Sequence, residues 1–320
     1  MCIRDRGNTK LYFSIGKDSI LDKLVSNIVV NRRSGATRDG NYLTDIIDPK
    51  QTIDGMRLIK SQNEIEVLKN AIETTDYAFN RAISFTSVGK FEYEIQAELE
   101  SEFRKAGSVR NGYPSIVASG NNSCVLHYTD NNSKLTEGDL LLIDAGAEID
   151  YYTADITRTW PVNGKFTNIQ KDIYNIVLEA QIKAINEVKP DTTIDSINKI
   201  AVTILTYGLM QIGLLTGNIE DLVEEKAYRK YYMHGTSHWL GIDVHDSGVY
   251  SKNNSFTKLK PGMVLTVEPG LYFNQYMDDL PQELTGIGIR IEDNILVTET
   301  GNINLSQKIP KEINLSLIHI

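Results

Sequence analysis

The spacing of apolar residues divides the start of the chain into short elements. Residues 10–16 (KLYFSIG) are expected to form a strand, and residues 19–30 (SILDKLVSNIVV) have the apolar periodicity of an amphipathic helix. Residues 42–49 (YLTDIIDP) predict a second strand that ends at a proline. We therefore expect residues 7–58 to be an α/β segment that is too small for a core of its own, and we interpret it as the carboxyl-terminal remnant of a larger amino-terminal domain.

A junction at 59–62 precedes longer blocks of helix and strand. Ser61 with Glu64, and Thr167 with Gln170, form capping-box patterns that predict helix starts. The helices are expected at about 61–85, 92–106, 168–188 and 193–213. The strands are expected in the runs PSIVASG, SCVLHY, DLLLIDAGAEI, YYTADITRTWPV, MVLTVEPGLYF and IGIRIEDNILVTETG.

This order of elements indicates the fold class. Helices and strands in separate blocks favour an α+β fold with an antiparallel sheet over a strictly alternating winding. The helix–strand order occurs twice after residue 60, which indicates a structural duplication.

Amino-acid composition disfavours some classes of binding partner and indicates the cellular compartment. The 320 residues are 41% hydrophobic and 23% charged, as in soluble globular proteins, and the net charge of −9 disfavours nucleic acid or an anionic membrane as the main partner. Two cysteines are too few for a disulfide framework. No apolar run is long enough for a membrane span, residues 201–215 are expected to be a buried helix, and no signal peptide is recognisable. We therefore expect a cytoplasmic protein.

Three of the five histidines lie within residues 233–246 (MHGTSHWLGIDVHD): His234, His238 and His245. A single histidine is most often a surface or satisfied core residue. The cluster, flanked by glycines and aspartates, favours a metal or proton-transfer site instead. It contains too few ligands, so the others must come from elsewhere in the chain.

Asp144 and Asp155 flank a predicted turn near residues 148–151. If the turn is centred between Ile149 and Asp150, the two aspartates lie opposite each other, with Cβ atoms roughly 4.5–5.5 Å apart. Both could be solvated surface residues, but Asp144 follows the apolar run LLLI, which should be buried. Two buried carboxylates at this distance need a shared proton or a cation between them.

Glu268 and Glu292 repeat this arrangement, since each lies inside an apolar, strand-like run. Together with Asp144, Asp155 and His238 they form a set that can neutralise two divalent cations. Ligands rich in carboxylate and free of sulfur suit Mn²⁺, with Co²⁺ or Zn²⁺ as alternatives. Two such ions, roughly 3.5–4 Å apart, form a hydrolase site.

Several long motifs carry a family resemblance. The chain resembles the pita-bread metallopeptidases, and in particular their Xaa-Pro aminopeptidase (aminopeptidase P) branch, from about residue 8 to about residue 313. The motifs are VLHYTDN, IDAG, ADITRTWPVNGKF, HGTSHWLGIDVHD, GMVLTVEPGLY and GIGIRIEDN. The order of the candidate ligands, Asp, Asp, His, Glu and Glu, is also that of the family. The resemblance implies a pita-bread catalytic domain at 59–313, with a duplicated antiparallel sheet covered by helices.

The resemblance also implies roles for the metal ligands. Asp144 would hold one metal with both oxygens, Asp155 and Glu292 would bridge the two metals, and His238 and Glu268 would complete the other site. A metal-bridging hydroxide would attack the carbonyl before proline, so that peptides with proline at position two are the expected substrates.

Five further side chains receive roles from the same resemblance. His234 would line the pocket for the proline ring. His127 and His245 would contact the substrate and stabilise the tetrahedral intermediate. Arg290 would orient a ligand carboxylate, and Tyr272 would join its network; the alternatives are a surface arginine and a packed aromatic.

The two ends depart from the family pattern. Only the last third of the family's amino-terminal domain is recognisable, at residues 8–58, and residues 1–6 and 314–320 match nothing in the family. We expect these ends to be artificial and the reading frame to be truncated, and we expect a homo-oligomer for the full-length protein.

Prolidase remains an alternative function, and a non-catalytic pita-bread peptide-binding protein is an alternative of another class. Methionine aminopeptidase and the metal-free creatinase branch fit less well.

Overall fold

The computed structural model describes residues 10–34 and 45–313. The contacts within the chain divide it into two units, Met1–Met56 and Arg57–Ile320. The predicted artificial ends, 1–6 and 314–320, lie outside the described residues. Among the helices of the described residues, none is long and apolar enough to cross a membrane.

The first unit contains the two predicted strands and the predicted helix. Strand β1 (Lys10–Tyr12) pairs in parallel with β2 (Asp45–Ile47), and helix α1 (Ser19–Ser34) lies between them in the chain. A further helix, α2 (Lys50–Leu58), follows β2 and was not expected from the sequence. The interpretation of this unit as a domain remnant stays a prediction.

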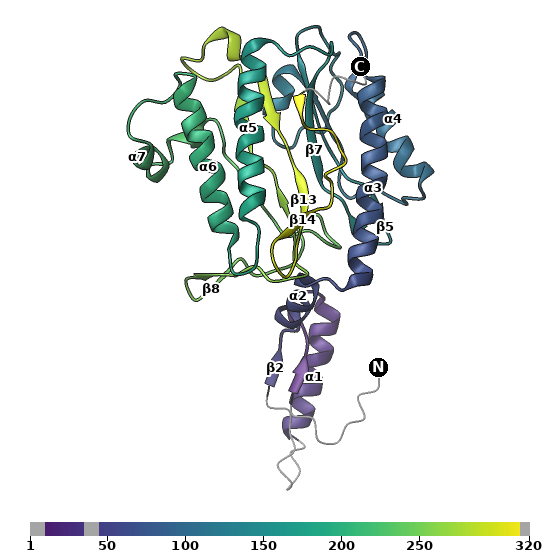
Figure 1. Ribbon diagram of the computed structural model, residues 1–320. Coiled ribbons are helices and arrows are strands. Elements are labelled where there is room, and N and C mark those ends of the chain that lie inside the picture. The colour runs from purple at the N-terminus through teal and green to yellow at the C-terminus, as the bar shows by residue number, and fades with distance from the viewer. Residues whose placement is uncertain (1–9, 35–44, 314–320) are drawn as a thin grey trace. The chain divides into compact units, whose positions relative to one another are not determined.

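The second unit is built from two helix pairs and two groups of strands (Figure 1). Helix α3 (Gln62–Phe85) packs with α4 (Glu92–Lys105), and α5 (Asn168–Glu187) packs with α6 (Ile194–Gln211). Both predicted capping boxes are present, at the starts of α3 and α5. The short helix α7 (Ile219–Glu224) and the 3₁₀ turns η2 (Ala227–Lys230) and η3 (Gln282–Leu284) belong to the connections.

Each helix pair is followed by an antiparallel sheet. The first sheet has the order β3 (Ile116–Ser119), β4 (Leu140–Ala145), β7 (Ile156–Pro161). The second has the order β10 (Val264–Val267), β13 (Asp293–Val297), β14 (Asn302–Asn304). The described residues of the unit also form three two-stranded pairs: β5 (Glu148–Ile149) with β6 (Tyr152–Thr153), β8 (Ser251–Lys252) with β9 (Ser255–Phe256), and β11 (Gly270–Phe273) with β12 (Ile287–Arg290). The predicted duplication of helix–strand order is therefore visible in the structure.

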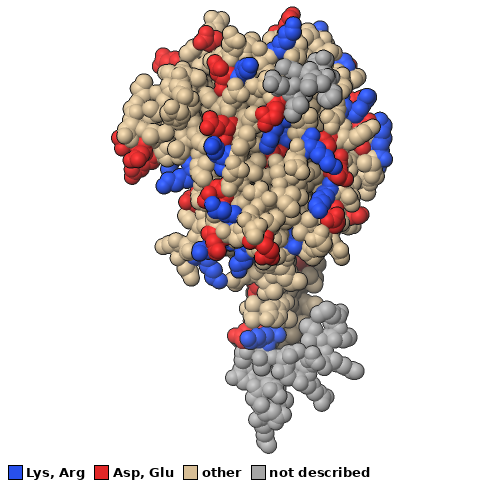
Figure 2. All heavy atoms as spheres, in the orientation of Figure 1, with Lys and Arg blue, Asp and Glu red and all other residues tan. Residues whose placement is uncertain are grey.

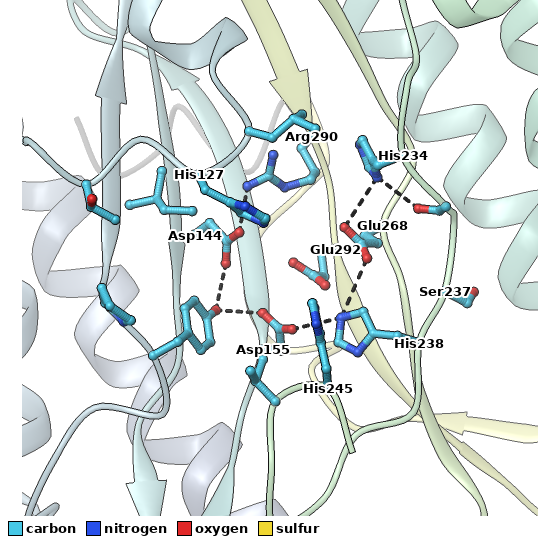
Figure 3. A pocket seen from close by; sticks show the side chains of 17 residues that line it. His127, Asp144, Asp155, His234, Ser237, His238, His245, Glu268, Arg290 and Glu292 are labelled. Carbon is cyan, nitrogen blue, oxygen red and sulfur yellow. Dashed lines mark hydrogen bonds and ion pairs between the residues drawn. The ribbon is translucent and has the colours of Figure 1, made fainter. Parts of the chain in front are cut away.

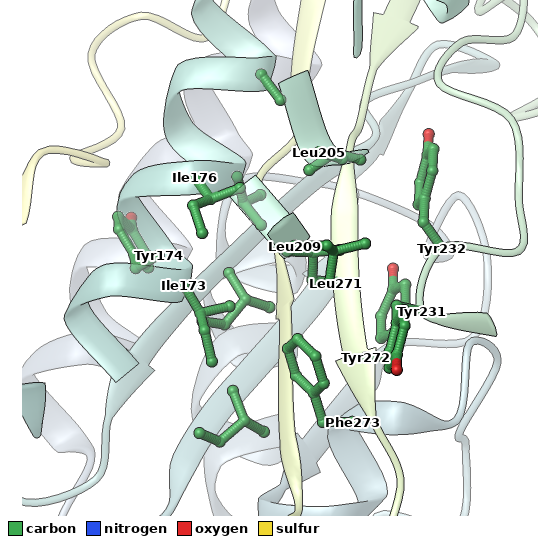
Figure 4. Close-up of a cluster of buried hydrophobic side chains, with 14 of the residues drawn as sticks. Ile173, Tyr174, Ile176, Leu205, Leu209, Tyr231, Tyr232, Leu271, Tyr272 and Phe273 are labelled. Carbon is green, nitrogen blue, oxygen red and sulfur yellow. The ribbon is translucent and has the colours of Figure 1, made fainter. Parts of the chain in front are cut away.

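The core lies between the helices and the strands. Figure 4 shows one cluster, in which Ile173 and Leu205 from α5 and α6 pack toward Leu271 and Phe273 of β11. On the outer face shown in Figure 2, acidic and basic side chains are interspersed. Burial of one apolar helix stripe against a sheet explains why the 3.6-residue period predicted these helices.

The predicted strand SCVLHY is wrong. Residues Gly120–Cys124 form the 3₁₀ turn η1, and the following residues are in bends and turns. Gly120 has a φ of +52°, and the Ser123 hydroxyl donates to the Gly120 carbonyl at 2.6 Å. Such local side-chain hydrogen bonds compete with strand pairing, and a short apolar run cannot overcome them.

The predicted register of the aspartate hairpin is also wrong, by one position at the turn. The turn residues are Asp150 and Tyr151, both with positive φ (46° and 73°), as a type I′ hairpin requires. Asp144 consequently pairs with Thr157 and not with Asp155. Asp155 precedes Thr157 by two residues, so the two carboxylates are diagonal neighbours on one face.

Candidate active site

A cavity of about 480 Å³ opens between the two sheets of the second unit (Figure 3). It is lined by every residue that the sequence singled out except Tyr272: His127, Asp144, Asp155, His234, His238, His245, Glu268, Arg290 and Glu292. Tyr272 lies directly behind this wall, hydrogen-bonded to His234 and Arg290. The structure therefore brings together residues up to 165 positions apart in sequence, from His127 to Glu292.

Glu268 and Glu292 lie where the hydrogen-bonded pairing of neighbouring strands is interrupted. The ladder of β10 with β13 ends at the pair Val267 and Asp293, and the ladder of β11 with β12 resumes at Gly270 and Arg290. Both ladders have the same register, and one further step from the first pair brings Glu268 opposite Glu292. The predicted antiparallel relation of these glutamates is thus present, at a break in pairing that frees both side chains to face the cavity.

Asp155 lies just before β7 and is held there by the second sheet. Its backbone N–H donates to Oδ1 of the buried Asn294 at 3.1 Å, and its carbonyl accepts from Nδ2 of the same residue. A buried asparagine that uses both ends of its amide in this way fixes the backbone of Asp155. The position of Asp155 is therefore set by β13 as well as by its own hairpin.

His238 directs one ring nitrogen toward the carboxylates. Its Nε2 is 3.1 Å from Oδ2 of Asp155 and 3.6 Å from Oε1 of Glu268, while Nδ1 donates to the Trp239 carbonyl at 3.0 Å. Asp155, His238 and Glu292 each offer a ligand atom within 4.8 Å of the others. A backbone carbonyl that accepts from the second ring nitrogen is the usual means of orienting a metal-binding imidazole.

Burial and mutual repulsion determine the protonation of the acids. Burial raises the pKa of Asp144 and of Glu292, and the Asp155 carboxylate raises both further. Burial likewise raises the pKa of Glu268 to about 7, although His238 opposes this effect. Burial lowers the pKa of His238, but the hydrogen bond and charge of Asp155 outweigh it and raise the pKa to about 9. These buried carboxyl groups can all be ionised together only when cations neutralise their negative charges. The set of side chains therefore fits divalent metal ions.

His234 has a different electrostatic environment from His238. Burial, followed by the Arg290 charge, lowers its pKa to about 3, so the ring is neutral. Nδ1 faces the Gly235 carbonyl at 2.8 Å and must carry the proton, because a carbonyl can only accept. Nε2 therefore accepts the Tyr272 hydroxyl proton at 2.7 Å.

Arg290 connects this pair to the acids. It is buried, and its guanidinium donates to Tyr272 Oη at 3.0 Å, to Asp144 Oδ2 at 2.6 Å and to Thr157 Oγ1 at 3.0 Å.

The remaining two predicted residues, His245 and His127, have fewer polar contacts than the others. The His245 ring lies 4.3 Å from the His238 ring, centroid to centroid, and burial lowers its pKa. His127 lines the cavity from the segment after η1 and is exposed to solvent.

Two hydroxyl groups that contact the acidic side chains of the site were not predicted from the sequence. The Tyr113 hydroxyl lies 2.6 Å from Oδ1 of both Asp144 and Asp155, and the Thr157 hydroxyl lies 2.6 Å from Oε2 of Glu292. Thr157 occurs within the motif ADITRTWPVNGKF, two residues after Asp155, and this spacing could have indicated that it shares a face with the aspartates. Nothing in the spacing around Tyr113 gave such a signal.

Comparison with known proteins agrees with this geometry. Residues 66–299 match the model of metallopeptidase family M24. The chain is 43% identical to an Xaa-Pro aminopeptidase of Escherichia coli over 311 residues, which cover 96% of this chain and 70% of that protein. It is 45% identical to an Xaa-Pro aminopeptidase of Haemophilus influenzae, over 91% of this chain and 65% of that protein.

The chain belongs to metallopeptidase family M24. Among solved structures of this family, a glutamate-to-alanine variant of Escherichia coli aminopeptidase P in complex with substrate is similar with a TM-score of 0.91 and 42% identity, over 98% of this chain and 71% of that one. Pseudomonas aeruginosa aminopeptidase PepP is similar with a TM-score of 0.93 and 39% identity. The resemblance to the Xaa-Pro aminopeptidases and the α+β pita-bread fold are thereby confirmed.

Proposed function

We propose that the protein is an Xaa-Pro aminopeptidase, a dimetal hydrolase that removes the first residue from peptides with proline at position two. The observation that carries the proposal is the cavity itself, in which four acidic side chains and His238 converge from two sheets. The M24 relatives named Xaa-Pro aminopeptidase support the choice of substrate. Cytoplasmic location and assembly of the full-length protein into oligomers stay predictions from the sequence.

Asp144, Asp155, His238, Glu268 and Glu292 would hold two divalent cations. We propose Mn²⁺, because four of the five ligands are carboxylates; a zinc-substituted aminopeptidase P among the similar structures supports a site that also accepts zinc. Bound cations would lower the pKa of a water molecule and polarise the scissile carbonyl. The roles of the individual ligands stay as the resemblance implies them.

The other side chains would bind and orient the peptide. Arg290 fixes the Asp144 carboxylate through a 2.6 Å ion pair and, with Tyr272, holds the neutral His234 in place. His127 and His245 face the cavity from separate segments and can donate toward an oxygen that gains negative charge. Apolar residues of the same wall, among them Leu126 and Val244, offer a surface for a proline ring, which has no N–H to satisfy.

The test is peptide cleavage by metal-stripped protein to which Mn²⁺ is restored, with Gly-Pro offered beside Arg-Pro-Pro. Release of arginine from the tripeptide is the expected result. Cleavage of Gly-Pro alone would assign the protein as a prolidase. A folded protein that binds Mn²⁺ and cleaves neither peptide would overturn the proposal and favour a peptide-binding role.

A further inference from the structure

One of the buried acids outside the cavity is the first residue of helix α4. Glu92 is 0% exposed, and both of its carboxylate oxygens are saturated by neutral donors. Oε1 accepts from Ser119 N at 2.7 Å, Ser119 Oγ at 2.7 Å and Asn122 Nδ2 at 3.0 Å. Oε2 accepts from Tyr128 Oη at 2.8 Å and Ser133 N at 2.9 Å. A buried carboxylate is tolerated only with such a set of donors, and the amino terminus of α4 adds a favourable dipole.

All five donors belong to one stretch of chain, residues 119–133, which we name the His127 segment. Oε1 accepts from Ser119 and Asn122 at the beginning of this segment, and Oε2 accepts from Tyr128 and Ser133 in its second half. Backbone hydrogen bonds at the start of α4 and just before it hold the end of the segment: Glu92 N donates to the Ser133 carbonyl at 2.9 Å, and Leu135 N donates to the Lys90 carbonyl at 2.7 Å. Glu92 therefore connects the two ends of the segment through one side chain.

His127 lies between the two attachments and directly precedes Tyr128, one of the donors. The segment is also packed closely on its other side, because a Cβ placed at Gly288 would lie 2.3 Å from the Ser123 carbonyl oxygen. The beginning of the segment is thus fixed between α4 and β12, and its later part is fixed by Glu92. The His127 side chain reaches the cavity from this fixed base.

We propose that Glu92 is a positioning residue, which holds the His127 segment so that His127 faces the reacting part of the cavity. The inference rests on the function proposed for the cavity and on the contact expected between His127 and substrate. A carboxylate is required because its oxygens accept from Ser119 N–H on one side and Ser133 N–H on the other. Glutamine has the same shape, but its amide NH₂ must face one of these backbone donors, which cannot accept.

The decisive experiment is a double-mutant cycle of Glu92→Gln with His127→Ala, using Arg-Pro-Pro and Mn²⁺-loaded protein. If Glu92 acts through His127, E92Q should lower kcat roughly tenfold in the wild-type background and less than about twofold in the H127A background. The KM should change much less than kcat. Asp130→Asn is the matched control, because Asp130 is an exposed carboxylate of the same segment, and it should leave kcat unchanged.

An equal loss of kcat in both backgrounds, or no loss in either, would overturn the proposal. If E92Q does not fold, as judged by circular dichroism, Tyr128→Phe replaces it in the cycle. This variant removes one donor to Oε2 and keeps the ring, and the same disappearance of its effect in the H127A background is expected.

Imidazole NMR signals of histidine-labelled, metal-free protein separate this inference from the proposed function. The His127 signal, assigned by its loss in H127A, should shift or broaden in E92Q, while the signals of His234, His238 and His245 stay in place. If wild-type protein cleaves neither peptide, the proposed function fails, and this shift still decides whether Glu92 holds His127. An unchanged His127 signal would refute the positioning role whatever the activity.

Discussion

The Thr157 hydroxyl donates a 2.6 Å hydrogen bond to Oε2 of Glu292, and the Glu292 N–H donates back to the Thr157 carbonyl at 3.1 Å. This reciprocal pair joins β7 of the first sheet to the residue just before β13 of the second, and both residues are buried. Thr157 also accepts from Arg290 Nε at 3.0 Å, so one hydroxyl links the buried arginine to a candidate metal ligand. Removing a group that orients a metal ligand in this manner typically weakens metal binding by about 10–100-fold.

Replacing Thr157 by valine removes this hydroxyl and keeps the shape of the side chain. We expect the affinity of the metal-free protein for Mn²⁺ to fall about 10–100-fold, because the Glu292 carboxylate loses its orienting donor. Isothermal titration calorimetry measures the change. Thr157→Ser keeps the hydroxyl and is the control, which should bind Mn²⁺ within a few-fold of wild type. Unchanged affinity in the valine variant would show that the hydrogen bond does not orient the ligand.

Asp155→Asn tests the metal site itself. Asparagine keeps the size of the side chain but supplies no charge to bridge two cations, so bound metal should fall below two ions per chain and peptide cleavage should be abolished. Elemental analysis of the purified variant, after dialysis against Mn²⁺, measures the stoichiometry. Asp150→Asn is the matched control, since Asp150 is exposed on the adjoining turn and asparagine tolerates its positive φ. Full activity in the Asp155 variant would refute the ligand assignment.

Asp293, next to Glu292 in the chain, anchors a buried ion network. It pairs with Arg158 at 2.7 Å and with Lys311 at 2.6 Å, and further donors from Gln181 and Ser306 satisfy its oxygens. Burial opposes its ionisation, but the charges of Arg158 and Lys311 outweigh this and lower its pKa. The network thereby ties the strand behind the cavity to the last described residues of the chain.

Removal of the Asp293 charge should therefore be costly. We expect Asp293→Asn to reduce the free energy of unfolding by about 3–5 kcal/mol, because it leaves the buried Arg158 without its anion. Urea denaturation in the presence of a chelator isolates this effect from metal binding. Glu73→Gln breaks the surface pair with Lys308, in which both side chains are more than 60% exposed, and should leave the free energy of unfolding nearly unchanged. Similar losses in the two variants would contradict the view that burial makes the difference.

Cys124 provides a prediction on pH dependence. Burial raises the pKa of its thiol from 9.0 to about 12, so the folded protein retains a proton that the unfolded chain releases above pH 9. Stability should consequently decrease as pH rises from 9 toward 12, on the order of 1 kcal/mol per pH unit. Urea denaturation of C2S and of C2S/C124A at pH 8 and pH 10 measures this, and the difference between the variants should shrink at the higher pH. A difference that is independent of pH would mean that the thiol is not shielded.

Residue types and periodicity predicted much of this site. The four long helices after residue 60 followed from apolar spacing and caps, because their stripes are buried against sheets. Glu268 and Glu292 could be paired in advance, since both lie inside apolar runs of similar length. The register of the aspartate hairpin could not, because its centre depends on Tyr151 adopting a left-handed φ that aromatic side chains seldom occupy.

The parts that escaped prediction are those fixed by tertiary contacts. Tyr113 and Thr157 are single hydroxyl residues without a periodic signature, and only the folded sheets bring them to the carboxylates. Glu92 was similarly concealed, because a glutamate in the first turn of a helix is an ordinary feature of sequences. Its significance lies in donors that begin 27 residues further along the chain.

The distribution of the candidate ligands over both sheets also bears on biosynthesis. Asp144 and Asp155 emerge from the ribosome before His238 and Glu268, and Glu292 emerges last of the five. The nascent chain therefore lacks the full set of candidate ligands until Glu292 has been made. The proposed cations would therefore meet their complete site only once the two halves of the second unit have docked, late in folding.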